Sequence, residues 1–176
     1  RGYHLQDGND PTASMTIDRE YDVRVRGGFK VVDGTTLTSY QSGFAHGRAF
    51  GYYQNDQPDD NDAEQAYAST RKAPDYKAEL DLAIVDANGE GASFTTVWYD
   101  ASNQIGILEP VGTVPRYRRI GLGRAVIYEG MNRIGKLGAK KMYVGSSQQF
   151  YLAIGFGVEY AKEIWQKTWS LSNGEM

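Results

Sequence analysis

A glycine-rich turn flanked by arginines offers the clearest chemistry in this sequence. Gly121 and Gly123 stand within the run Arg118-Arg119-Ile120-Gly121-Leu122-Gly123-Arg124. Where such a turn opens a helix, the first backbone N–H groups have no partner inside the helix and point, with the positive end of the helix dipole, toward a bound anion. The two glycines would let the backbone approach that anion closely. The segment is therefore predicted to bind phosphate.

The segments on either side of this turn make the phosphate interpretation stronger than the motif alone. An arginine followed by two glycines at this spacing often arises by chance. Here a strand is predicted over Ile105–Thr113, and Pro115 ends it because proline cannot donate to a sheet ladder. An apolar stripe at helical spacing then predicts a helix over 121–137, with Gly138 as its left-handed terminator. A strand, a glycine turn and a helix in this order favour an anion site.

Two blocks of the sequence resemble the GNAT superfamily of acyl-CoA-dependent N-acyltransferases. They are Thr113-Val114-Pro115-Arg116-Tyr117-Arg118-Arg119-Ile120-Gly121-Leu122-Gly123-Arg124-Ala125 and Phe150-Tyr151-Leu152-Ala153-Ile154-Gly155-Phe156. The second block is similar to the family's Leu-Tyr-x-x-x-Gly-Phe signature. The run Leu108-Glu109-Pro110-Val111-Gly112-Thr113 resembles a bacterial subgroup in which such domains often occur in tandem or beside a second one. The specific motifs cover about 109–156, and the segment before Leu80 matches in pattern alone.

The resemblance implies a fold and a cofactor site. The expected fold is α/β (α+β), with a central mixed, mostly antiparallel twisted sheet that is splayed at the acyl-CoA site and carries helices on both faces. Backbone groups of Val111 and Thr113 would pair with the pantetheine arm of the cofactor like an added strand, while amides from Arg119 to Arg124 take the pyrophosphate. The expected cofactor-binding residues are Val111, Gly112, Thr113, Arg118, Arg119, Ile120, Gly121, Leu122, Gly123 and Arg124.

Acyl transfer to an amine needs a base and is helped by an acid, because only the neutral amine attacks a thioester and the departing thiolate takes a proton. By resemblance Tyr151, five residues before Phe156, is the acid, and its alternative role is that of a packed helix tyrosine. Glu109 is the candidate base, with bracing of the splayed strands as its alternative role. Its parity along the strand predicts that it shares a face with Val111 and Thr113. The segment before Tyr151 is short and lacks the asparagine that many family members have there.

Composition excludes several other classes of function. The chain has no cysteine and only two histidines, His4 and His46, so we expect neither a disulfide nor a metal site. A net charge of -3 gives no electrostatic footprint for nucleic acid. No apolar run approaches the roughly 20 residues that span a bilayer, and no signal peptide is evident, so we expect a cytoplasmic protein without membrane contact.

The other elements are predicted from periodicity and turn residues. Alternation around Gly27-Gly28 predicts a hairpin of strands at 21–25 and 29–32, and Gly43 and Gly47 predict a broken helix over 35–53. A solvated acidic loop is expected over 55–64, with attraction of a cationic amine to the acceptor pocket as its alternative role. Further strands are predicted at 80–85, 93–99, 141–144 and 158–169, with Tyr160, Ile164 and Trp165 available for burial, and short helices at 62–71 and 148–154.

The function expected on this basis is N-acetyl transfer from acetyl-CoA, as co-substrate, to a primary amine of a small molecule, directly within a ternary complex. A non-catalytic acyl-CoA-binding or sensor domain and a protein or peptide N-acetyltransferase are the alternatives. Residues 1–176 are expected to form one GNAT domain with its motif-bearing core at about 79–169. The chain starts at Arg1 instead of methionine, which is expected of a trimmed start, a disordered start or a piece cut from a longer protein with an upstream domain. A homodimer or a second GNAT domain is the expected partner. The aromatic residues that could line an acceptor pocket or pack in the core are Tyr40, Phe44, Tyr52, Tyr53, Trp98 and Tyr99.

Overall fold

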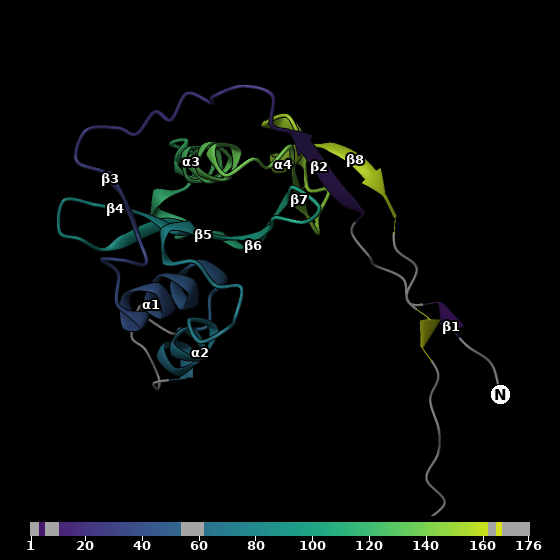
Figure 1. Cartoon of the computed structure of the whole chain (residues 1–176). Helices are drawn as coiled ribbons and strands as arrows, with labels where there is room; N and C mark the ends of the chain where they lie inside the picture. The colour runs from purple at the N-terminus through teal and green to yellow at the C-terminus, as the bar shows by residue number, and fades with distance from the viewer. Residues whose placement is uncertain (1–3, 6–10, 54–61, 162–164, 167–176) are drawn as a thin grey trace, which may run out of the picture.

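The structure, a computed structural model, describes residues 4–5, 11–53, 62–161 and 165–166. Its centre is a seven-stranded sheet in the order β3-β4-β5-β6-β7-β2-β8, in which only the β6–β7 pair is parallel (Figure 1). The strands are β2 (Thr12–Thr16), β3 (Lys30–Asp33), β4 (Asp81–Val85), β5 (Gly91–Asp100), β6 (Ile105–Thr113), β7 (Lys141–Val144) and β8 (Gly157–Tyr160). The expected mixed, mostly antiparallel sheet is confirmed.

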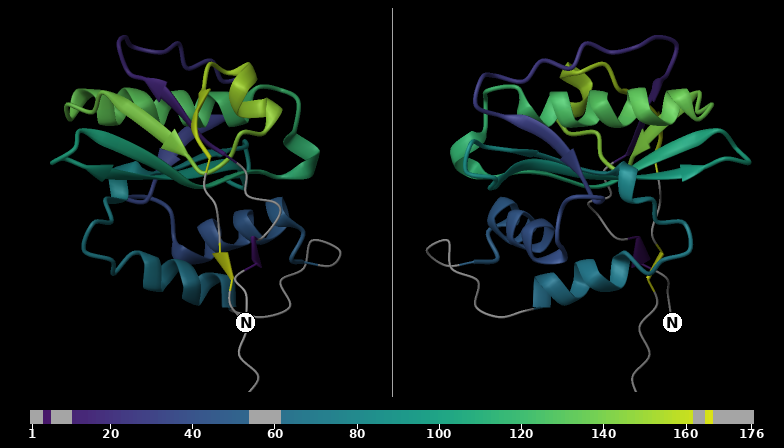
Figure 2. Two further views of the ribbon diagram at one scale, coloured as in Figure 1. Left: turned by 90° about the vertical axis from the view of Figure 1, so that its right-hand side faces the viewer. Right: turned by 60° about the vertical axis from the view of Figure 1, so that its left-hand side comes forward.

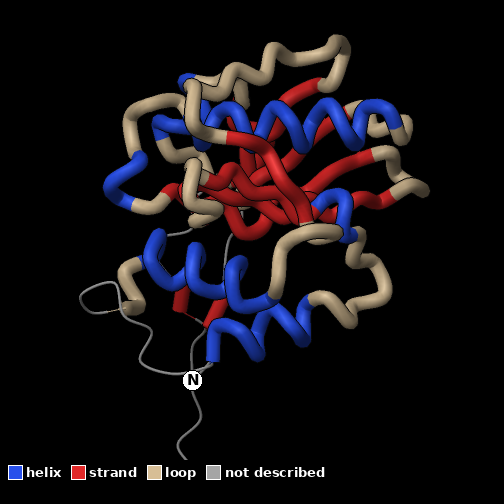
Figure 3. Tube along the Cα trace, turned by 90° about the vertical axis from the view of Figure 1, so that its left-hand side faces the viewer, coloured by secondary structure: helices blue, strands red, loops and turns tan. Residues whose placement is uncertain are grey.

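Helices cover both faces of this sheet, as predicted. On one face lie α1 (Ser39–Phe50) and α2 (Asp62–Thr70), and on the other lie α3 (Leu122–Lys136) and α4 (Gln149–Ala153) (Figures 2 and 3). A short 3-10 helix, η2 (Ala78–Leu80), directly precedes β4, and another, η3 (Pro115–Tyr117), follows β6. The main core packs α3 against the sheet through Val126, Ile127, Met131 and Ile134, all fully buried. A separate small pair, β1 (His4–Leu5) with β9 (Trp165–Gln166), lies away from the sheet in Figure 1.

The sheet opens beside the second half of β6. Strand β6 pairs with β7 only from Ile105 to Leu108, whereas its pairing with β5 continues to Thr113. The Val114 N–H donates to the Ala92 carbonyl at 2.9 Å. Because hydrogen-bonded and non-bonded positions alternate along an antiparallel pair, the backbone groups of Val111 and Thr113 face away from β5. They lie along an edge that no described strand covers.

Helix α1 runs without a break through Gly43 and Gly47, so the predicted interruption is wrong. The reason is tertiary packing, which overrides the low helix propensity of glycine. A Cβ at Gly43 would lie 2.7 Å from the Ala63 backbone, and a Cβ at Gly47 would lie 2.3 Å from the Tyr53 ring. Glycine at these two positions therefore lets α2 and Tyr53 lie directly against α1.

The predicted hairpin before α1 is only half right. Residues 29–32 fall largely within β3, but 21–25 form no strand. Instead, the Tyr21 N–H donates to Asn132 Oδ1 at 2.7 Å, and Asn132 Nδ2 donates to the Tyr21 carbonyl at 2.8 Å. The Asn132 side chain on α3 thus takes the place of a strand partner for this segment.

Two other expectations need correction, and one strand was not expected. The acidic loop ends earlier than predicted, because Asp62 already begins α2, and its residues 54–61 lie outside the described part. The last strand region divides into β8 and β9, and Tyr160 is 47% exposed on an edge strand. Ile164 and the side chain of Trp165 lie outside the described residues. Strand β2 was not predicted, and it fills the position between β7 and β8.

Replacing Asn132 with alanine should destabilise the fold. The change leaves the buried N–H and carbonyl of Tyr21 without partners, and each such group costs about 1–3 kcal/mol. We expect the free energy of unfolding to fall by about 2–4 kcal/mol, measured by denaturant unfolding. Asn88→Ala, at an exposed position with no side-chain hydrogen bond to another described residue, should change it by less than about 0.5 kcal/mol, and equal effects of the two variants would contradict the assigned role.

Candidate active site

A pocket of about 740 Å³ lies where the sheet opens. It is bounded by the second half of β6, by the turn before α3 and by α4. The lining includes nine of the ten residues predicted to bind cofactor, together with Tyr151: Val111, Gly112, Thr113, Arg118, Arg119, Gly121, Leu122, Gly123 and Arg124. The remaining one, Ile120, packs against the main core instead. Residues distant in the sequence are thus brought together as the motif predicted.

The turn before α3 has the backbone shape of an anion site. Gly121 is the N-cap of α3 with φ +89°, Arg119 has φ +65°, and no side chain caps the helix. Left-handed residues next to right-handed ones turn successive N–H groups toward one point, where they favour negative charge. The first N–H groups of α3 add to this, because they lack partners within the helix. The residues of this turn line the pocket.

Gly123 matters for a different reason from Gly121. A Cβ at Gly121 would meet nothing within 4 Å, so glycine is needed there for its positive φ alone. A Cβ at Gly123 would lie 3.1 Å from the Phe150 ring and 3.2 Å from Thr113 Oγ1. Gly123 therefore keeps open the space between β6 and α4 in which a ligand could lie.

The four arginines of the motif region do not act alike. Arg116 is salt-bridged to Glu90 and lies over the Tyr117 ring, away from the pocket. Arg118 lines the pocket but donates to two backbone carbonyls, from Nε to Thr113 at 3.0 Å and from a terminal nitrogen to Ala49 at 2.9 Å. It ties the end of β6 to the end of α1. The exposed Arg119 and Arg124 remain as the side chains suited to contact cofactor phosphates.

Tyr151 lies on α4 and is buried, with 9% of its surface exposed. Its ring is held edge-on between Phe150, with centroids 5.1 Å apart, and Phe156 at 5.9 Å. Burial raises the pKa of its phenol above the usual value. The hydroxyl therefore keeps its proton at neutral pH, as an acid must. The ring also packs, so both of the predicted roles fit its position.

Glu109 lies on the opposite face of the sheet from Val111 and Thr113, so the expectation that all three share a face is wrong. The cause is a bulge: Thr95 pairs with Val111 and Val97 with Leu108, so that Glu109 and Pro110 together oppose Thr96. One extra residue in a strand reverses the faces that follow it. Glu109 thus lines a second pocket, on the α1–α2 side.

This second pocket has a volume of about 600 Å³ and adjoins the first along two elements. On β6, Glu109 and Pro110 line the second pocket and Val111 begins the lining of the first. On α1, His46 lines the second, whereas Ala49 and Phe50 line the first. Two ligands, one in each pocket, would meet near the bulge in β6.

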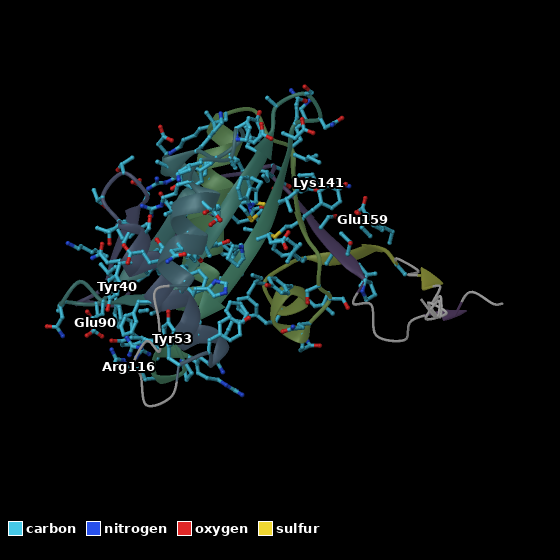
Figure 4. All side chains as sticks on the ribbon, turned by 90° about the horizontal axis from the view of Figure 1, so that it is seen from below. Tyr40, Tyr53, Glu90, Arg116, Lys141 and Glu159 are labelled. Atoms are coloured by element: carbon cyan, nitrogen blue, oxygen red, sulfur yellow. The ribbon has the colours of Figure 1, made fainter. Side chains whose placement is uncertain are left out.

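Most of the second pocket's lining was missed from the sequence. Of the six aromatic candidates, only Tyr52 and Tyr53 line it. Trp98 instead donates from Nε1 to the Glu109 carbonyl, and the Tyr99 hydroxyl donates to the Leu137 carbonyl. His46 and Tyr67 were not predicted, although both line the pocket and the His46 Nδ1 lies 3.1 Å from the Tyr67 hydroxyl. In Figure 4, seen from the α1–α2 side, Tyr53 lies on the opposite side of the molecule from the Lys141–Glu159 pair.

Within the described residues, no three His, Cys, Asp or Glu side chains are grouped so as to hold a metal ion. None of the helices found there is long and apolar enough to cross a membrane.

Solved structures of N-acetyltransferases share this arrangement. A GCN5-related N-acetyltransferase from Sphaerobacter thermophilus superposes with a TM-score of 0.71 at 18% identity, covering 93% of this chain and 52% of that one. A glucosamine N-acetyltransferase region of a fungal multi-domain β-N-acetylglucosaminidase gives 0.68 at 13% identity, with 93% and 21% covered. A tandem GNAT protein from the clavulanic acid biosynthesis pathway gives 0.63 at 14%, with 93% and 53% covered.

These similarities concern the fold, since all three identities are low. No protein-family model matches the sequence, and no curated protein matches it significantly. The chain spans about half the length of the Sphaerobacter and clavulanic acid pathway proteins. The order of the strands, the opening between β6 and β7 and the structural matches agree with the two sequence blocks: the chain has the fold of the GNAT superfamily.

Proposed function

We propose that this domain is an acyl-CoA-dependent N-acetyltransferase that acetylates a small primary amine. The observation that carries the proposal is the uncovered edge of β6 at Val111 and Thr113, which faces the turn before α3 and Tyr151 across one pocket. An extended pantetheine arm would add to this edge as a strand does. Its pyrophosphate would then lie at the N-terminus of α3.

The chemistry assigned to the site is a direct transfer. Glu109 takes one proton from the ammonium that the second pocket brings, and the neutral amine attacks the thioester carbonyl carbon. The carbon–sulfur bond of the tetrahedral intermediate then breaks, and the departing thiolate takes the proton of the Tyr151 phenol. The nitrogen gives its remaining extra proton to the Tyr151 phenolate, and Glu109 releases its proton to water, so that both residues are restored. The products are the N-acetylamine and free CoA. The chain has no cysteine, so an acyl group carried on a cysteine sulfur is excluded.

A thiol-release assay tests this function. Purified protein with acetyl-CoA and a panel of amines should release one free thiol for each molecule of acetylated amine found by mass spectrometry. Binding of acetyl-CoA without release of thiol, on amines and peptides alike, would favour a non-catalytic acyl-CoA-binding domain. Release with peptides alone would favour the protein acetyltransferase.

Gly123→Val tests the cofactor half of the site. The valine side chain would fill the space between Phe150 and Thr113, so we expect the Kd for CoA to rise about tenfold or more in a calorimetric titration. A tenfold rise corresponds to a loss of about 1.4 kcal/mol of binding free energy. Gly145→Val is the matched control, because a Cβ there meets nothing within 4 Å and Gly145 does not line the pocket. Equal Kd values for the two variants would place CoA elsewhere.

A second GNAT domain remains our proposed partner, with a homodimer as the alternative. The match to a tandem GNAT protein, about half of which this chain covers, supports the first choice.

A further inference from the structure

Aromatic rings line the second pocket from its buried part to its exposed rim. Tyr67, 8% exposed, belongs to the buried part, and Tyr52, 65% exposed, belongs to the rim. The His46 ring connects them, with its centroid 5.8 Å from each of the two tyrosine rings. Tyr53 adds another ring, placed against α1 by the absence of a side chain at Gly47.

Small residues of α2 form the facing side. Ala63 and Ala66 line the pocket, and Gly43 allows the backbone of α2 to approach α1 at Ala63. The resulting volume of about 600 Å³ lies within the range of small-molecule sites. A compact apolar group would therefore be in contact with rings on one side and methyl groups on the other.

The described lining of this pocket carries negative charge and no positive charge. Glu109 is its acidic lining residue, and no lysine or arginine of the described part lines it. Burial lowers the pKa of His46 and raises that of Tyr67, so both rings are neutral near pH 7. Thr96 donates its hydroxyl to Asp81, which is also paired with Arg71, so that this nearby carboxylate already has partners within the protein. Among the described lining residues, one ammonium of a ligand thus finds a partner, whereas a carboxylate or a second ammonium finds none.

We propose that the second pocket selects primary monoamines with an aromatic or aliphatic body and discriminates against amines that carry a second charge. This inference rests on the proposed function, because it makes the pocket the acceptor side of that reaction. Glu109 holds the ammonium before taking its proton, and the tyrosine rings contact the body and add cation–π attraction. A further charge on the ligand would lose water without gaining a partner among the described lining residues.

Matched pairs of amines test the selectivity with the wild-type chain. Hexylamine and 1,6-diaminohexane differ by one ammonium, and 2-phenylethylamine and phenylalanine differ by one carboxylate. In the thiol-release assay we expect kcat/KM for each monoamine to exceed that of its partner at least tenfold. Equal or higher values for the diamine or the amino acid would overturn the inference while leaving the acetyltransferase function in place.

A binding measurement separates failure of this inference from failure of the function. If none of the four amines releases thiol, the proposed small-amine function fails, and calorimetric titration with hexylamine and 1,6-diaminohexane then decides the pocket's preference. Tighter binding of hexylamine, by tenfold or more, supports the inference. Equal or tighter binding of the diamine overturns it.

A substitution on α2 ties the preference to this pocket. Ala66→Leu would occupy the space opposite the rings, so we expect KM for 2-phenylethylamine to rise at least fivefold while the Kd for acetyl-CoA stays unchanged. Ser69→Leu adds the same group to an exposed position of the same helix that does not line the pocket, and it should change neither constant. An unchanged KM in Ala66→Leu would mean that the amine binds elsewhere.

Discussion

Tyr151→Phe is expected to lower kcat by about 100-fold or more while leaving the Kd for acetyl-CoA within about twofold of the wild-type value. The variant keeps the ring and its edge-on packing against Phe150 and Phe156, and it removes only the hydroxyl. The thiolate must then leave without a proton donor. Stopped-flow or steady-state thiol release gives kcat, and calorimetry gives Kd.

Tyr128→Phe is the matched control for this prediction. Tyr128 donates its hydroxyl to the Ile154 carbonyl at 3.0 Å, next to the end of α4, but does not line the cofactor pocket. Its loss should cost about 1 kcal/mol of stability and leave kcat unchanged. If the two variants have the same kcat, Tyr151 is a packing residue and the proton must come from another group.

The pH dependence follows from the direction of the pKa shift. Burial raises the pKa of Tyr151 above its usual value of 10.0. Its proton is present below that raised pKa and is lost only as pH rises through it. Loss of the acid should therefore not reduce wild-type kcat anywhere below pH 10.

Glu109→Gln has the second largest expected effect. With no carboxylate to take the proton, only the small neutral fraction of a free amine, whose pKa is about 10, can react. We expect kcat/KM at pH 7 to fall about 100-fold. The deficit should shrink as pH rises toward 10, because the amine then loses its proton to water.

Glu79→Gln is a suitable control, since Glu79 is exposed and lies outside both pockets. It should behave as the wild type at every pH. A deficit in Glu109→Gln that stays constant from pH 7 to pH 10 would argue for the bracing role of Glu109 instead of a role in proton transfer.

The first pocket, bounded by β6 and the turn before α3, could be predicted because its determinants are local in the sequence. A glycine turn at the start of a helix and a strand that proline ends fix most of the backbone by themselves. Gly121 shows this, since its φ of +89° depends on the turn and not on any neighbour. The packing of the Ile120 side chain against the core could not be predicted, because which side chain of the turn meets the core depends on how α3 packs.

The lining of the second pocket could not be predicted, because it depends on contacts between distant elements. The face on which Glu109 lies is set by the register of β5 against β6, and a single bulge reverses it. Gly43 and Gly47, which predicted a broken helix, instead permit the close packing of α2 and Tyr53 on α1. Strand β2 was missed for a similar reason: the sheet buries its polar Thr12 and Ser14, and Ser14 donates to Glu159 across the sheet.

A crystal structure of the acetyl-CoA complex tests the central claim most directly. The account predicts that the pyrophosphate accepts hydrogen bonds from backbone amides between Arg119 and Arg124, that the pantetheine arm pairs with Val111 and Thr113, and that the Tyr151 hydroxyl lies within hydrogen-bonding distance of the sulfur. Cofactor bound elsewhere, or bound here with its sulfur out of reach of Tyr151, would contradict it.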